Sequence, residues 1–334
     1  MIPPALSNDL SYSDPLLPAP EQAPSPALGA GPVWRGPEPP RRFQHVVWKH
    51  VLLFLLTLAT TTLVGADHYV AFLSEFRPKQ VTFDWHLLVR GLWYSLTILS
   101  VLGAHEMGHY LACRRYQVDA TLPYFLPLPP PFFTGTLGAV IRIREAFPTR
   151  AILFDIGVAG PIAGFVILVP ALFVGLSLST IVPAPAETSN LIYLGEPLLF
   201  QWATRLVFGA VADGYTLNMH PIVFASWFGM LATALNLLPF GQLDGGHITY
   251  ATLGRWSTPI SIATVATALV MTFVASSWLV MTVMMVVMLL LFGPRHPRVI
   301  YEHEPIGRGR QVVAILALII LILCFTPVPL KFAS

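Results

Sequence analysis

Two histidines and a glutamate stand close together in one of the most apolar stretches of the chain. His105, Glu106 and His109 belong to the segment His-Glu-Met-Gly-His, and Glu106 is the sole acidic or basic side chain between Arg90 and Arg114, histidines aside. Placing an ionisable side chain in the middle of a bilayer costs about 3 kcal/mol on insertion scales, so such residues normally mark a functional site. This segment therefore indicates chemistry inside a membrane.

The spacing of the two histidines suits a metal ion. On an α-helix, residues four apart lie on one face and are separated by about 6 Å along the axis, so both imidazoles point toward one spot. Two imidazoles make half of a zinc site, and a glutamate beside the first can act as general base toward a water molecule. The same pattern also arises by chance in soluble helices, where the side chains are solvated. An apolar segment does not offer that solvation.

A catalytic zinc ion needs a third protein ligand and one open position. Asp244 is the natural choice, because it follows a second apolar segment whose end reaches the same membrane level as His105. Pro239 removes one backbone donor from that helix and the following glycines loosen it, so a broken helix can line a polar cavity. The alternative is a plain Asp-Gly turn at the water boundary. We expect His247, beyond the break, to lie near water and outside the metal shell.

The composition is that of a membrane protein. Of the 334 residues, 55% are hydrophobic and 11% are charged, whereas soluble domains average about 25% charged residues. The net charge of +2 gives no sign of nucleic-acid binding. A window of about 20 residues predicts an all-α polytopic fold with seven transmembrane helices. The predicted spans are 46–66, 86–113, 151–181, 219–243, 259–276, 278–293 and 311–326, with 191–211 expected to lie at the interface.

The distribution of Lys and Arg predicts an orientation. If the amino terminus is cytosolic, fourteen of the 19 basic residues fall on the cytosolic side and five on the other, which is the usual bias. The helix that carries His105 and His109 then runs from outside to inside. Its metal site is expected to face the cytosolic half of the bilayer.

Two motifs in this arrangement resemble those of the site-2 protease family of intramembrane zinc metalloproteases, peptidase family M50. One is the His-Glu-x-x-His helix at 105–109, and the other is the later Asn, Pro and Leu-Asp-Gly helix at 236–246. The resemblance covers roughly residues 85–250, including the order and direction of the helices. Either motif alone is moderate evidence, and the two at one membrane depth are much stronger.

The resemblance implies a reaction and its residues. The expected activity is zinc-dependent hydrolysis of a peptide bond within or near a transmembrane segment of a membrane-tethered protein. The partners are then a transmembrane protein substrate and the lipid bilayer, and nothing in the sequence indicates an oligomeric state. One zinc ion per chain would be held by His105, His109 and Asp244, with Glu106 as the catalytic base and Asn236 lining the substrate site.

Two functions of other classes use similar residues. A metal transporter also places His and Asp on broken helices in mid-membrane, but it typically has paired broken helices in repeated halves, and neither motif recurs here. A catalytically idle scaffold would lack the base, yet Glu106 is present.

The segment from Pro123 to Arg144 is apolar and interrupted by proline, so it is predicted to be a re-entrant loop followed by a short strand over 139–143. An exposed edge of such a strand could pair with an unwound substrate, because hydrolysis needs an extended peptide. A hydrophobic plug that limits water access explains the segment equally well. The small residues of 157–164 are expected to let one helix approach its neighbours closely.

Four regions are expected along the chain. Residues 1–44 are proline-rich and lack apolar periodicity, which predicts a disordered cytosolic tail. The tail resembles neither a signal peptide nor a transit peptide, so a bacterial plasma membrane is favoured over an organelle membrane. The mixed-charge residues 294–304 could suggest a second metal site, but a solvated loop is favoured. The other regions are the first transmembrane helix with its outer loop (45–84), the catalytic core (85–250) and the C-terminal transmembrane helices (251–334).

Overall fold

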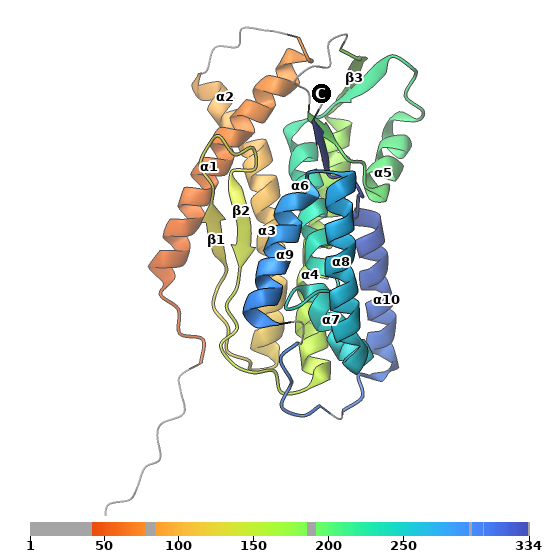
Figure 1. Ribbon diagram of the computed structural model, residues 1–334. Coiled ribbons are helices and arrows are strands. Elements are labelled where there is room, and N and C mark those ends of the chain that lie inside the picture. Colours follow the sequence, from red (N-terminus) through yellow and green to blue (C-terminus); the bar gives the residue numbers. More distant parts are fainter. Residues whose placement is uncertain (1–41, 78–83, 186–191, 294–295, 303, 333–334) are drawn as a thin grey trace, which may run out of the picture. The chain divides into compact units, whose positions relative to one another are not determined.

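Helices predominate in the protein, as the sequence predicts. The computed structural model describes residues 42–77, 84–185, 192–293, 296–302 and 304–332 (Figure 1), so the predicted disordered tail falls almost wholly outside the described residues. The helices are α1 (Val47–Ser74), α2 (Trp85–Arg90), α3 (Leu92–Arg115), α4 (Arg150–Ser177), α5 (Leu198–Phe208), α6 (Pro221–Leu237), α7 (Asp244–Leu253), the 3-10 turn η1 (Gly254–Trp256), α8 (Ser257–Val274), α9 (Trp278–Phe292) and α10 (Gly307–Cys324).

Five helical stretches among the described residues are long and apolar enough to cross a membrane. Two of the seven predicted spans are shorter helices: α6 has 17 residues and α9 has 15. The span predicted over 219–243 is helical only to Leu237, because Pro239 removes a backbone donor and the chain breaks before Asp244. The five long stretches are Val47–Ser74, Trp85–Arg115, Arg150–Ser177, Asp244–Val274 and Gly307–Cys324.

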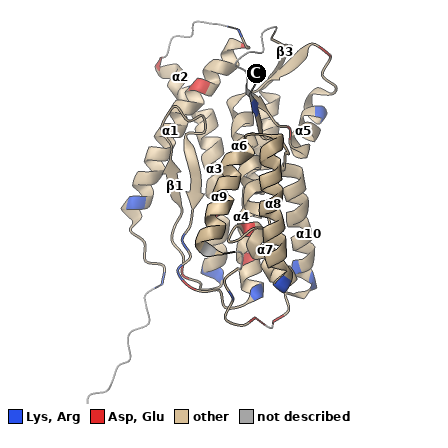
Figure 2. Cartoon of the chain, in the orientation of Figure 1, with Lys and Arg blue, Asp and Glu red and all other residues tan. Residues whose placement is uncertain are grey.

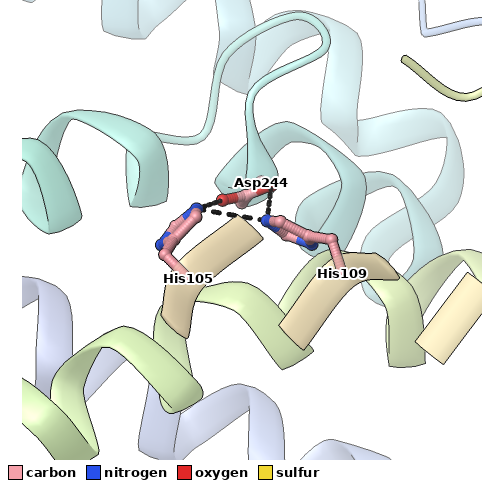
Figure 3. A group of neighbouring side chains, drawn as sticks. All are labelled: His105, His109 and Asp244. Carbon is pink, nitrogen blue, oxygen red and sulfur yellow. Dashed lines mark hydrogen bonds and ion pairs between the residues drawn. The ribbon is translucent and has the colours of Figure 1, made fainter. Parts of the chain in front are cut away.

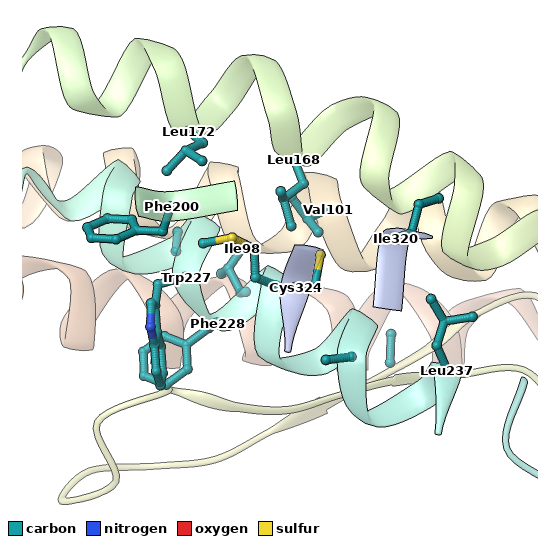
Figure 4. Packing of buried hydrophobic residues seen from close by; sticks show 14 of the residues in the cluster. Ile98, Val101, Leu168, Leu172, Phe200, Trp227, Phe228, Leu237, Ile320 and Cys324 are labelled. Atoms are coloured by element: carbon teal, nitrogen blue, oxygen red, sulfur yellow. The ribbon is translucent and has the colours of Figure 1, made fainter. Parts of the chain in front are cut away.

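Helix α4 is the centre of the helix packing. It contacts α3, α5, α6, α7 and α10, and its sequence is apolar throughout apart from Arg150 and Asp155 at its start. Leu168, Leu172 and Leu176 of α4 are fully buried. Figure 4 shows how Leu168 and Leu172 meet the neighbouring helices in one core. The partners labelled there are Ile98 and Val101 of α3, Phe200 of α5, Trp227, Phe228 and Leu237 of α6, and Ile320 and Cys324 of α10.

Three small antiparallel sheets of two strands each accompany the helices in the described residues. The strand predicted over 139–143 is β2, and it occupies Thr136–Val140 instead. The prediction was wrong beyond Val140 because the next amide leaves the strand and bonds to a side chain of α3. Ile143 forms only an isolated bridge with Ala120. The pairs are β1 (Tyr124–Pro127) with β2, β3 (Thr180–Pro183) with β5 (Tyr215–Asn218), and β4 (Ile192–Leu194) with β6 (Leu330–Phe332).

The loop between β1 and β2 is tied to α1 and α3 by its backbone carbonyls. Three consecutive carbonyl oxygens at the end of this loop each accept a hydrogen bond from a side chain of one of these helices. Non-helical backbone is tolerated at membrane depth only where protein groups satisfy it, so these contacts let an irregular segment lie among apolar helices. The pairs are His68 Nε2 with Phe133 O at 3.0 Å, Tyr94 Oη with Thr134 O at 2.8 Å, and Thr60 Oγ1 with Gly135 O at 2.7 Å.

Removing one of these donors is expected to destabilise the protein. Tyr94 is fully buried, so Tyr94→Phe leaves the Thr134 carbonyl without its partner at a cost of about 1–3 kcal/mol. The midpoint of denaturant unfolding in detergent should fall accordingly. Tyr193→Phe is the matched control, because Tyr193 is 45% exposed. Equal midpoints for both variants would contradict the anchoring role.

Candidate metal centre

His105 and His109 project from α3 toward each other (Figure 3). Their Nε2 atoms are 3.1 Å apart, and each residue is only 6% exposed. The Nδ1 atom of His109 lies 2.7 Å from the carbonyl oxygen of Ile156 on α4. Because that oxygen can only accept, Nδ1 carries the proton, and in the neutral ring Nε2 keeps its lone pair. The contact with α4 therefore prepares His109 to be a metal ligand.

Glycines of α4 leave the space that the two imidazoles occupy. A Cβ atom on Gly160 would lie 2.1 Å from His109 Nε2, and one on Gly164 would lie 3.2 Å from the Cβ of His105. The close helix approach expected from residues 157–164 is thus present. It also leaves space for the side chains of His105 and His109. A side chain at position 160 would overlap the His109 ring, whereas one at position 164 would only crowd His105.

Asp244 completes the group from the first turn of α7. Its Oδ2 atom is 3.1 Å from His105 Nε2, and its Oδ1 atom is 3.2 Å from His109 Nε2. The side chain is only 13% exposed, so the predicted alternative of a plain turn at the water boundary does not describe it. The carboxylate lies between both imidazoles, as Figure 3 shows.

The break between α6 and α7 is held by α8. Thr264 Oγ1 donates to the carbonyl oxygen of Pro239 at 3.3 Å, and Ser261 Oγ accepts from Gly241 N at 3.4 Å. The break also packs against itself, because a Cβ atom on Gly245 would lie 2.0 Å from Leu237 O. Sequence analysis missed both hydroxyl residues. Their spacing of three along an apolar helix, one turn apart on one face, is the signal that could have found them.

Glu106 lies beside the three ligand candidates and contacts the β1–β2 hairpin. It is 8% exposed, and its Oε2 atom accepts a hydrogen bond from Ile141 N at 3.0 Å. This backbone amide is the first one after β2. The carboxylate is thereby tied to the strand, an interaction that no side-chain pattern in the sequence predicts.

Asn236 lies in the last turn of α6, at the edge of the same group. Its Nδ2 atom is 3.4 Å from His105 Nε2. The structure therefore brings together all five predicted site residues around one buried point. His247, which was expected to stay outside the metal shell, is not a member of the cluster.

The geometry of the three side chains fits zinc. Tetrahedral zinc with bonds of about 2.1 Å places its ligand atoms about 3.4 Å apart. The two Nε2 atoms are 3.1 Å apart, each has one of the two Asp244 oxygens within 3.2 Å, and with one ligand atom taken from each residue all three lie within 4.8 Å of one another. Two imidazoles and one carboxylate are also a common protein donor set of catalytic zinc sites, which leave a position open. Within the described residues, His105, His109 and Asp244 form the one such cluster of potential metal ligands.

Comparison with known proteins gives a family match and several relatives. The family model of peptidase family M50 matches residues 93–280. The chain is 30% identical over 234 residues to the probable zinc metalloprotease EGY1, chloroplastic, of Arabidopsis thaliana, covering 66% of the chain and 42% of that protein. It is 32% identical over 243 residues to the rice protein of the same name, covering 66% and 40%.

A third relative covers more of the chain. The probable zinc metalloprotease EGY2, chloroplastic, of Arabidopsis thaliana is 29% identical over 294 residues, which cover 85% of the chain and 48% of that protein. The chain thus spans less than half the length of these relatives. No solved structure shows significant similarity.

Adding one methyl group at Gly160 should abolish tight zinc binding. In Gly160→Ala the new Cβ atom would overlap the His109 ring, and displacing a metal ligand or its support typically weakens affinity by about 10–100-fold or more. Zinc affinity of the purified protein can be measured by competition with a chelating dye. Gly309→Ala is the control, because no atom lies within 4 Å of its Cβ position. Similar zinc affinity in both variants would contradict the placement of His109.

Proposed function

The chain belongs to peptidase family M50, and from this premise we propose that it is a zinc-dependent endopeptidase that cleaves a peptide bond within or near a transmembrane segment of another membrane protein. The observation that carries the proposal is the meeting of His105, His109 and Asp244 inside an apolar helix bundle. Zinc metalloprotease relatives support the same chemistry. The lipid bilayer is then the environment of both enzyme and substrate.

Each residue of the centre has a distinct part in this proposal. His105, His109 and Asp244 hold one zinc ion, which when bound polarises the scissile carbonyl and lowers the pKa of a water molecule. Glu106 takes the proton of the attacking water and delivers it to the leaving amine nitrogen. Asn236, whose amide faces the same point, positions the substrate chain.

The free edge of β2 is the proposed docking site for an extended substrate. In the described residues β2 has a single strand partner, β1. The backbone N–H and carbonyl of Arg142 point toward Thr121, which lies just before β1. The N–H donates to Thr121 Oγ1 and the carbonyl accepts from Thr121 N. Backbone groups alternate along a strand, so those of Ala139 point away from β1, toward the same side as the Ile141 amide that reaches Glu106. A substrate paired there would lie beside the catalytic base.

A hydrophobic plug is the other predicted use of this segment. The three carbonyl contacts with α1 and α3 hold the end of the loop in place. A fixed hairpin suits a template for pairing, whereas a plug that opens would have to break these bonds. We therefore favour the docking role, within a re-entrant loop between the second and third spans.

The remaining features of the architecture are also proposals. We propose seven spans, in which α6 and α9 cross with the five longer stretches, and a catalytic core over residues 85–250 flanked by regions 1–44, 45–84 and 251–334. We also propose a cytosolic amino terminus, because basic residues lie at the end of the bundle where α3 ends and α10 begins (Figure 2) and such residues are usually on the cytosolic side. The bacterial plasma membrane predicted from the sequence gains no support from the relatives, whose names place them in chloroplasts.

Replacing the base should separate proteolysis from the other two functions. Glu106→Gln is expected to keep zinc and to lower the cleavage rate of a reconstituted single-span substrate by at least about 10²–10⁴-fold, the usual contribution of a general base. Cleavage is measured by gel and mass spectrometry, and zinc by elemental analysis.

Glu145→Gln is the control for this experiment, because Glu145 pairs with Arg42 at 3.0 Å and is partly exposed. A metal transporter or a scaffold would retain metal flux or partner binding in Glu106→Gln. Undiminished cleavage by that variant would contradict the assigned base.

Proline at position 139 should impair substrate docking. Ala139→Pro removes an amide from the free edge of β2 and leaves the ladder to β1 in place, since edge positions tolerate proline. Cleavage of the single-span substrate should fall at least tenfold while zinc content stays at one ion per chain. Val140→Pro is the comparison, because the backbone groups of Val140 should point toward β1, like those of Arg142 two residues on, and losing this amide should also destabilise the hairpin. Unchanged cleavage in Ala139→Pro would end the docking proposal.

A further inference from the structure

A second pair of histidines lies beyond the metal centre, one turn along α7 from Asp244. His247 Nδ1 is 2.6 Å from Nε2 of His296, which belongs to the segment between α9 and α10. The sequence predicted that this segment is solvated and that His247 lies near water. That prediction was wrong for His296, which is 9% exposed. His303, part of the same predicted loop, lies outside the described residues.

The separation of the two nitrogens identifies a hydrogen bond. Two imidazoles that share a tetrahedral zinc ion have ligand atoms about 3.4 Å apart, well above the 2.6 Å found here. No acidic residue or cysteine joins the pair in a metal-binding cluster among the described residues. The second metal site considered from the sequence therefore has no support in this geometry.

The direction of this hydrogen bond follows from the backbone. His296 Nδ1 is 2.6 Å from the carbonyl oxygen of Pro297, so Nδ1 donates. Burial lowers the pKa of His296, which favours the neutral ring, and Nε2 must then accept. His247 Nδ1 is consequently the donor in the pair. The chain of contacts holds both rings in one tautomer and one orientation.

The segment that carries His296 is itself docked on the protein. Ile300 N donates to Phe147 O at 3.1 Å, and Tyr301 N donates to Pro148 O at 2.8 Å. The His296 ring stacks on Tyr250 of α7, with 4.5 Å between ring centroids. The acceptor offered to His247 is thus part of a fixed structure.

His247 is held on its other side by α4. A Cβ atom on Gly157 would lie 2.9 Å from the Cβ of His247, so the two helices touch there. With α4 on one side and His296 on the other, α7 has little freedom to rotate about its axis. Asp244, one turn earlier on the same helix, shares that restriction.

We propose that His296 is a positioning residue of the metal centre, which acts through His247 to fix the rotation of α7 and the direction of the Asp244 carboxylate. The inference rests on the proposed function only in taking Asp244 as a zinc ligand. If this inference holds, metal binding also depends on His296, which lies outside the two sequence motifs. Support of this kind typically contributes about 10–100-fold to metal affinity.

The test compares zinc affinity in three variants of the full chain, purified in detergent and measured by competition with a chelating dye. His296→Phe keeps a ring to stack on Tyr250 but offers no acceptor, and its affinity should fall at least about tenfold. His296→Gln restores an acceptor and should stay within about threefold of the wild type. Val299→Ala is the matched control, because Val299 belongs to the same segment as His296 and is buried against Leu153 of α4 and Tyr250 of α7. It loosens packing while keeping the hydrogen bond.

The outcomes separate the hydrogen bond from general loop packing. Wild-type affinity in His296→Phe, or an equal loss in Val299→Ala, would overturn the proposal. The unfolding midpoints of the metal-free variants are measured in parallel. The proposal is supported if His296→Phe loses zinc affinity although its unfolding midpoint equals that of Val299→Ala. If zinc-loaded wild type fails to cleave any membrane substrate, the proposed function fails while the affinity comparison still decides the role of His296.

Discussion

The protein depends on bringing the side chains of two histidines and one aspartate together in the interior of an apolar helix bundle, with their potential ligand atoms within 4.8 Å of one another. Burying a carboxylate away from water is costly unless opposite charges or hydrogen-bond donors compensate it. Asp244 has two imidazoles against its oxygens, and a divalent cation would supply the remaining charge. The cluster is therefore a strong reason for the surrounding helices to pack as they do.

Helix α4 makes that packing possible because glycines replace larger side chains on the faces that it turns toward α3 and α7. Its glycines face the imidazoles of α3 and His247 of α7, so these side chains pack directly against the backbone of α4. Its Ile156 carbonyl also orients His109. One helix with no candidate ligand of its own thus makes room for two of the three candidate ligands and orients one of them.

The proposed base shares α3 with two of the proposed metal ligands, but its side chain is held by a different contact. The ligands are held by α4, by the hydroxyls of α8 and by the segment that carries His296. Glu106 is instead bonded to the end of β2, whose hairpin is tied to α1 and α3.

The sequence by itself determined the local features. An ionisable pair four residues apart in an apolar helix, and an Asp after a proline break, identified His105, Glu106, His109 and Asp244, because helix periodicity and the cost of burying charge can be read along the chain. Asn236 came only from the resemblance to the site-2 protease family. Tertiary structure decided the support of the site. The contacts of Ser261, Thr264, His296 and the Ile141 amide join segments far apart in sequence, and backbone amides carry no residue-specific signal. The early end of β2 was also a tertiary outcome, since it depends on a hydrogen bond to Glu106 of α3 that local preference does not encode, whereas the end of α6 at Leu237 follows from the nearby Pro239.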